Sequence, residues 1–157
     1  MTGESIPETP AWVARTKLLL DSWEQLLGKP LIPRETPLAD AVRLYEAPFV
    51  VVAHGTEDDP ILNYANLTAL TLWETQLEHL LQMPSRKTAE PVHRDERAEL
   101  LRRTREDGFI DDYSGIRISA TGQRFQIHQA TVWNLTDADG QHAGQAAAFS
   151  RWTPLAD

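Results

Sequence analysis

The sequence predicts an α+β domain: a five-stranded antiparallel sheet with helices on one face and N-terminal helices covering the other. The main observation is a pair of hairpin signals, Thr121-Gly122 and Asp139-Gly140, in the last third of the chain. Their glycines supply the positive φ that tight hairpin turns need, so they predict three consecutive antiparallel strands. The first third has instead the apolar spacing and the start and stop signals of helices. The β-branched run Val50–Val52, between these parts, predicts the first strand.

Two helices are expected at the N-terminus. Thr9 is a typical N-cap, and Pro10 suits the first helical position. Gly28 is a typical C-terminal stop. The pair Thr36-Pro37 repeats the start signal for a second, shorter helix that Pro48 ends. The apolar stripe of the first helix consists of Trp12, Thr16, Leu19, Leu20, Trp23, Leu26 and Leu27.

The middle of the chain alternates short strands and helices. Asn66 is expected to cap a short helix, and a long charged helix is expected at 94–107, ended by Gly108. Ala98, Leu101 and Thr104 give that helix a narrow apolar stripe, so most of its surface should face water. The five predicted strands are Phe49–His54, Ile61–Tyr64, Asp112–Ser119, Arg124–Asp137 and Gly144–Thr153.

The segment Arg124–Leu135 is apolar at both parities, which indicates a strand covered on both faces. The first helix would cover one face or carry a dimer contact. We therefore divide the chain into an N-terminal helical extension, residues 1–47, and a sheet domain, residues 48–157. Phe125, Ile127, Thr131, Trp133 and Leu135 share one parity, and Ala130 and Val132 share the other.

Composition excludes several classes of function. The formal charge of −8 argues against a nucleic-acid binder, because neutralising phosphates needs clustered Lys and Arg. The chain has no cysteine, which excludes disulfides, thiol catalysis and thiolate metal sites. It has no signal-peptide pattern and no apolar run near the ~20 residues of a membrane helix. We therefore expect a cytoplasmic protein with no membrane contact.

Several blocks of residues together resemble one known family. They are Leu44-Tyr-Glu-Ala-Pro-Phe, Ala53-His-Gly-Thr-Glu, Asn63-Tyr-Ala-Asn, Pro84-Ser-Arg-Lys-Thr-Ala-Glu-Pro, Gly115-Ile-Arg-Ile-Ser and Ala130-Thr-Val-Trp-Asn-Leu. The chain is similar over about Leu18–Leu155 to the MEKHLA family, PAS-related domains that also occur at the C-terminus of some plant homeodomain–leucine-zipper factors. The resemblance implies a PAS-like fold and a sensory or ligand-binding role, without a defined ligand.

A weaker similarity is to the flavin-binding LOV branch of PAS domains. Pro84-Ser85-Arg86 falls where LOV domains have Asn-Cys-Arg, and Ala89 stands where they have glutamine. A serine hydroxyl lacks the photochemical reactivity of a thiol, so no cysteinyl adduct can form. Non-covalent flavin binding stays open.

Haem and metal sites are disfavoured. His79, His93 and His128 are the histidines considered as haem ligands, but none lies at a clear ligand position, and surface or hydrogen-bonded histidines are more common. The acidic pairs Asp58-Asp59 and Asp111-Asp112 lack the spacing of a calcium loop. We expect solvated carboxylates and no metal site.

No nucleophile and base occur at a diagnostic spacing, so we name no catalytic residue and expect a protein that is not an enzyme. The leading hypothesis is a sensory, small-molecule-binding domain in signalling or regulation, which acts through a protein partner or a homodimer. The alternative is a ligand-free interaction module with a filled core. A small enzyme that uses the same cavity is the third class.

A ligand should lie between the inner face of the sheet and the helices that span residues 66–108. Mostly apolar walls with a few converging polar groups are typical of ligand pockets. In the alternative, bulky side chains fill this space and Arg86 pairs only with a carboxylate, that of Glu74, Glu90 or Asp95. The expected walls include Leu70, Trp73, Arg86, Arg117, His128 and Asn134.

Overall fold

The computed structural model describes residues 6–88 and 94–156, and its helices begin and end at the predicted signals. Helix α1 (Pro10–Leu27) follows Thr9, whose hydroxyl accepts a hydrogen bond from the Trp12 N–H, and it ends at Gly28 with φ of 74°. Among the described residues, no helix combines the length and the apolar character needed to cross a bilayer. The other helices are η1 (Ile6–Glu8), α2 (Pro37–Tyr45), α3 (Leu67–Trp73), α4 (Leu77–Leu80), η2 (Ser85–Thr88) and α5 (Arg94–Asp107).

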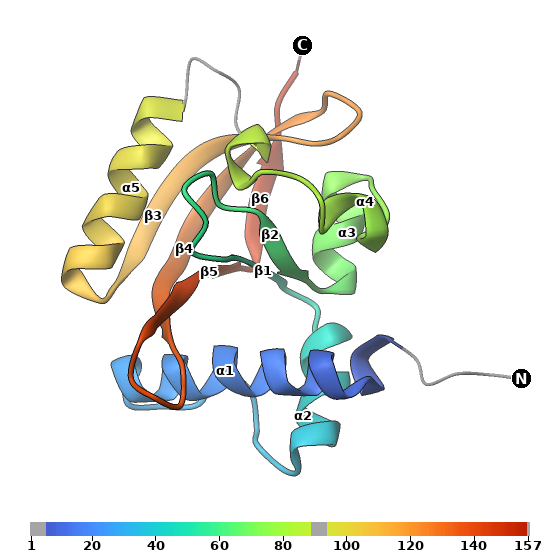
Figure 1. The fold of residues 1–157 in the computed structure, drawn as a ribbon. Helices are drawn as coiled ribbons and strands as arrows, with labels where there is room; N and C mark the ends of the chain where they lie inside the picture. The colour runs from blue at the N-terminus through green and yellow to red at the C-terminus, as the bar shows by residue number, and fades with distance from the viewer. Residues whose placement is uncertain (1–5, 89–93, 157) are drawn as a thin grey trace, which may run out of the picture.

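The strands form one antiparallel sheet in the order β2-β1-β5-β4-β3 (Figure 1). The prediction of an antiparallel sheet with helices is confirmed. The last predicted strand is interrupted at Ser150, and both parts of it pair with β4. The strands are β1 (Val50–His54), β2 (Leu62–Ala65), β3 (Phe109–Ile118), β4 (Arg124–Thr136), β5 (His142–Phe149) and β6 (Arg151–Pro154).

Both predicted hairpin turns are present. Gly122 has φ of 91° in the β3–β4 turn, and Gly140 has φ of 81° in the β4–β5 turn. Their N–H groups donate to the carbonyls of Ser119 and Asp137, three residues earlier. The dipeptides found in the sequence therefore fix the order of the three C-terminal strands.

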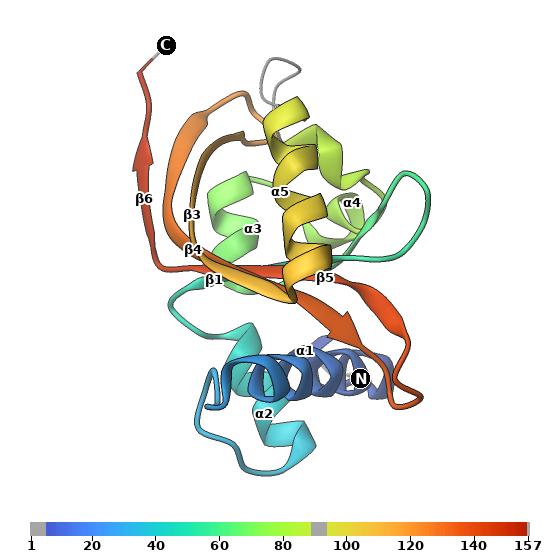
Figure 2. The same ribbon diagram turned by 90° about the vertical axis from the view of Figure 1, so that its left-hand side faces the viewer.

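Helices cover both faces of the sheet (Figure 2). Helices α1 and α2 lie on one side of β1 and β5, and α3, α4 and α5 lie on the other. Leu19 and Leu20 are fully buried, and the Trp133 indole N–H of β4 donates to the Leu19 carbonyl at 3.2 Å. Helix α1 thus packs against its own sheet, which was one of the two predicted arrangements. Its core is continuous with that of the sheet, and the boundary between residues 47 and 48 stays a prediction.

Strand β4 reverses its alternation at Gln129. This residue has φ of 50°, and the register between β3 and β4 shifts between Tyr113 and Gly115. The extra residue of such a bulge moves every later side chain to the opposite face. Phe125 consequently packs against Trp73 of α3, whereas Trp133 packs against Trp23 of α1.

Phe125 and Trp133 have equal parity in the sequence, and the prediction that they share one face of β4 is wrong. Both faces of β4 are nevertheless apolar, as predicted. Ala130 and Val132 lie with Phe125 and Ile127 on the α3–α5 side, and Trp133 lies on the α1 side.

Helix α5 also differs from its prediction in one respect. Ala98 is exposed, and Arg97 and Leu100 are buried with Thr104. The buried stripe follows i, i+3 and i+7, so it includes an arginine in place of the predicted alanine. Helix α5 thereby places a guanidinium group between itself and the sheet.

Candidate functional site

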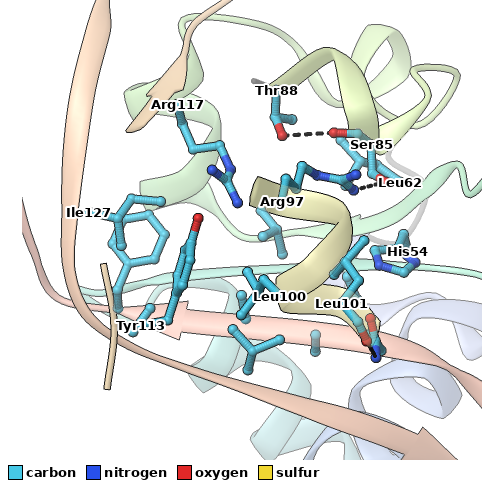
Figure 3. Close-up of a pocket in the computed structure, with 18 of the residues that line it drawn as sticks. His54, Leu62, Ser85, Thr88, Arg97, Leu100, Leu101, Tyr113, Arg117 and Ile127 are labelled. Carbon is cyan, nitrogen blue, oxygen red and sulfur yellow. Dashed lines mark hydrogen bonds between the residues drawn. The ribbon is translucent and has the colours of Figure 1, made fainter. Parts of the chain in front are cut away.

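A cavity of about 70 Å³ lies between the inner face of the sheet and helices α3 to α5 (Figure 3). Its walls come from β1 to β5 and from the helical layer, and this is the space in which the sequence analysis expects a ligand. Most of the lining is apolar. The apolar side chains are Val52, Ala53, Leu62, Trp73, Leu80, Leu100, Leu101, Ile127, Ala130, Val132, Ala146, Ala147 and Phe149.

Strand β3 supplies two polar side chains, Tyr113 and Arg117. Residues 113, 115 and 117 alternate onto the inner face, with Gly115 between the two side chains. Arg117 is 7% exposed, its Nη1 donates to the Ile116 carbonyl at 2.9 Å, and its Cζ lies 5.3 Å from the centre of the Tyr113 ring. In Figure 3, the hydroxyl of Tyr113 and the guanidinium of Arg117 point toward each other.

The helical side of the cavity is held by Arg97 and the segment η2. Arg97 is 8% exposed and donates from Nη2 to the Ser85 hydroxyl. The Thr88 hydroxyl donates to the Ser85 carbonyl at 2.7 Å, and the Ser85 N–H donates to the Pro60 carbonyl. These bonds connect α5, η2 and the segment before β2 around one end of the cavity (Figure 3).

His54 ends β1 and lines the cavity, although it is not among the six predicted wall residues. Its Nδ1 lies 3.0 Å from the Gly55 carbonyl, which makes Nδ1 the protonated nitrogen and leaves Nε2 as an acceptor. Burial lowers the pKa of His54, and the charge of Arg97 lowers it further. The signal for His54 was its parity, because alternation along β1 places it on the same face as Val50 and Val52.

Three buried polar atoms at this cavity have no hydrogen-bond partner in the described part of the chain. They are the His54 Nε2, the Trp73 Nε1 and the Tyr113 hydroxyl oxygen. Buried polar groups in folded proteins are paired in roughly nine cases out of ten. Three such atoms around one cavity can therefore form hydrogen bonds with a bound polar molecule.

The cavity adjoins a surface pocket of about 280 Å³ between the β1–β2 segment and α5. His54, Leu101 and Gln145 line both spaces. Gln145 is held in place, since its Nε2 donates to the Leu101 carbonyl at 2.8 Å and to Asn134 Oδ1 at 3.1 Å. These three side chains form the partition between the cavity and the surface pocket.

Of the six residues predicted as cavity walls, the structure brings Trp73 and Arg117 together at the cavity. Leu70 packs against the core outside it. Asn134 lies behind Gln145 and donates from Nδ2 to the Arg105 carbonyl at 3.2 Å.

The other two predicted wall residues, Arg86 and His128, lie at the surface. Arg86 is paired with Asp59 at 3.0 Å, a carboxylate that the sequence analysis had not named as its partner. His128 precedes the bulge at Gln129, and its Nε2 lies 2.8 Å from the Thr153 hydroxyl of β6. A role for Leu70, Arg86, His128 and Asn134 in ligand binding stays a prediction.

The remaining candidates of the sequence analysis lie elsewhere. His79 is exposed on α4, and His93 and Ala89 lie outside the described residues. Within residues 6–88 and 94–156, no group of three or more acidic or histidine side chains could hold a metal ion.

Solved structures show which fold this is. The chain is similar to the PAS domain of a protein from Colwellia psychrerythraea, with a TM-score of 0.60 at 13% identity, over 74% of this chain and 94% of the other. It is also similar to a light-oxygen-voltage domain studied with a flavin analogue, with a TM-score of 0.55 at 19% identity, over 78% and 87% of the two chains. A PAS domain from a two-component sensor histidine kinase gives a TM-score of 0.55 at 17% identity, over 73% and 91%. At these identities the likeness concerns the fold alone.

Sequence comparison shows the family. The chain is 21% identical over 154 residues to the homeobox-leucine zipper protein ATHB-14 of Arabidopsis thaliana, which covers 95% of this chain and 18% of the plant protein. The chain thus spans about a fifth of the length of this relative. The model of the MEKHLA domain matches residues 13–154. The chain therefore belongs to the MEKHLA domain family, and it has the PAS-like fold that its sequence predicts.

Proposed function

We propose that this chain is a sensory domain that binds a small polar molecule in the cavity between its sheet and α3–α5. The observation that carries the proposal is that three residues with an unpaired buried polar atom, His54, Trp73 and Tyr113, line the same cavity as two buried arginines, Arg97 and Arg117. Each buried polar atom without a partner costs about 1–3 kcal/mol, and three of the seven such side-chain atoms among the described residues belong to residues that line this one cavity. A bound polar molecule would offset that cost.

Output would pass through a protein partner or a second copy of the chain. Binding, and not catalysis, fits the cavity best. Among the hydrogen bonds of the described residues, no serine hydroxyl donates to a histidine, and the Ser85 hydroxyl accepts from Arg97.

A flavin does not fit this cavity. Pockets for molecules of that size have volumes of about 300–1,000 Å³, several times the 70 Å³ found here. The guanidinium of Arg97 and its bond to the Ser85 hydroxyl occupy one end of the space.

The test is a thermal-shift screen of small metabolites against the purified protein, followed by native mass spectrometry of each compound that raises the melting temperature. A ligand of the folded state raises stability by RT ln(1 + [L]/Kd). Ala147→Leu, which fills the cavity, should abolish the shift. Ala120→Leu, the same change at an exposed turn residue, should retain it.

The small volume of the cavity also favours a second candidate, a ligand-free interaction module. In that case ordered water would satisfy the polar atoms, since one water needs only about 10–15 Å³. If no compound raises the melting temperature of the unmodified chain, of Ala147→Leu or of Ala120→Leu, the result would favour this candidate and reject the sensory proposal.

A further inference from the structure

We propose that the cavity selects a small carboxylate, whose head group is bound by Arg117 and Tyr113 and whose short apolar part faces the sheet. This proposal rests on the proposed function and specifies its ligand class.

The charge of the cavity favours an anion. Arg97 and Arg117 are both lining residues, and no Asp or Glu is found among the described lining residues. None of the ion pairs between described residues involves Arg117. A buried charge without a counter-charge is costly, so an anion beside Arg117 would stabilise the folded protein.

The hydrogen-bond donors favour a carboxylate head group. A guanidinium has five N–H donors in a planar fork, and the described bonds of Arg117 engage one nitrogen, Nη1, with the Ile116 carbonyl. The fork matches the two oxygens of a carboxylate. The Tyr113 hydroxyl is unpaired, lies at the same end of the cavity (Figure 3), and can donate to the same head group.

The remaining walls favour an organic acid over an inorganic anion. Apolar side chains, among them Leu100, Ile127, Val132 and Ala147, make up most of the remaining lining, and they offer no hydrogen bond to a second set of oxygens. A tetrahedral phosphate would leave oxygens unsatisfied against them. An alkyl group would be stabilised there by burial.

The volume limits the length of the acid. The volume of about 70 Å³ is roughly five to seven times the 10–15 Å³ that one water needs. A molecule of about four to six heavy atoms, such as acetate, propionate or pyruvate, fits this limit.

The experiment compares acids with their uncharged isosteres. Sodium acetate, propionate and pyruvate, the amides acetamide and propionamide, and inorganic phosphate are titrated into the full chain at constant ionic strength. Binding is measured by calorimetry and by the shift in melting temperature. Propionate should bind at least about tenfold more tightly than propionamide, as expected for a charge-assisted fork.

Variants locate the site. Arg117→Met keeps the length of the side chain without its charge and should weaken propionate binding about tenfold or more. Arg43→Met, which removes an arginine of α2 paired with Glu35 on the other side of the sheet, should leave binding unchanged. If Arg117→Met does not fold, the comparison of propionate with propionamide on the unmodified chain decides alone.

Each remaining outcome overturns the proposal in a distinct way. Equal binding of propionate and propionamide, or stronger binding of phosphate, would reject the carboxylate class and leave the sensory function standing. Binding of propionate that Arg117→Met does not weaken would place the acid outside this cavity. If no acid binds, the carboxylate proposal fails, and the metabolite screen with Ala147→Leu decides the sensory function separately.

Discussion

The phenol of Tyr113 lies over Gly115, so close that a Cβ on residue 115 would come within 2.0 Å of the Tyr113 hydroxyl oxygen. The two residues belong to the same inward face of β3, and the missing side chain of Gly115 makes room for the ring beside Arg117. The position of the Tyr113 hydroxyl therefore depends on the absence of one methyl group.

Gly115→Ala should accordingly destabilise the protein by about 1–3 kcal/mol, the usual cost of overpacking. The measurement is the free energy of unfolding in urea. Repeating it in a Tyr113→Ala background provides the control, because the added methyl group then has room. There Gly115→Ala should be neutral or stabilise by up to about 1 kcal/mol, since alanine reduces the entropy of the unfolded chain. Equal costs in both backgrounds would show that the contact with Tyr113 is not the cause.

Leu20→Ala should cost about 2–5 kcal/mol of unfolding free energy, because Leu20 of α1 is fully buried against the core of the sheet. Leu38→Ala on α2 is the matched control. Leu38 is 48% exposed, and its substitution should change stability by no more than about 0.5 kcal/mol. An unchanged melting temperature for Leu20→Ala would contradict the burial of α1.

Asn66→Asp should destabilise the fold strongly at neutral pH. The buried Asn66 amide accepts from the N–H groups of Val51 and Ala69 through Oδ1, and it donates from Nδ2 to the carbonyls of Leu44 and Phe49. A carboxylate keeps the two acceptor bonds but faces two carbonyl oxygens, so we expect a loss of about 3 kcal/mol or more.

Burial should raise the pKa of the new carboxyl in the folded state, because its protonated form can still donate to one carbonyl. The loss should therefore shrink as pH falls toward 4. It is measured by urea unfolding between pH 4 and 7, and a loss that is independent of pH would contradict this account of the contacts of Asn66.

The stability of the protein should depend on the titration of His54. The pKa of this buried imidazole is lowered from 6.5 by burial, with contributions from Arg97 and His142, while the hydrogen bond to Gly55 and the charge of Glu57 oppose the shift. A lowered pKa means that the unfolded chain binds the proton first. The free energy of unfolding that depends on neutral His54 is therefore fully present above pH 6.5, and it is lost as pH falls from 6.5 toward the pKa of the folded state.

His54→Gln removes this titration and should flatten the fall in unfolding free energy between pH 7.5 and 5.5. His142 is retained in both proteins, since its own pKa is lowered by burial and by Arg105 and acts in the same direction. Parallel pH profiles for the two proteins would exclude His54 as the titrating group.

The elements of this fold could be predicted because their signals are local. Thr9 and Gly28 determine the ends of α1, and Gly122 and Gly140 determine the hairpins, through the φ angles and hydrogen bonds of a few neighbouring residues. The same holds for Asn66 as the cap of α3. Each signal acts within about four residues, so one sequence is enough to find it.

The face on which a side chain lies could be predicted only where the period is unbroken. No glycine marks the bulge at Gln129, so counting along β4 gave the wrong relation between Phe125 and Trp133. On α5, the pattern favoured Ala98, but the buried residue is Arg97. A long charged side chain can be buried where a polar group accepts its hydrogen bond, and the Ser85 hydroxyl is that group for Arg97.

By itself, the sequence determined the family, the order of the helices and strands, and two of the cavity residues, Trp73 and Arg117. Only the tertiary structure decided that His54 and Arg97, 43 residues apart in the chain, line one cavity, and that Arg86 instead pairs with Asp59 at the surface. The physical reason is that capping and turn formation are contacts between near neighbours, whereas a cavity is what remains after distant elements have packed. Its lining depends on bulges and on the fit of whole helices against the sheet, and no short stretch of sequence encodes either.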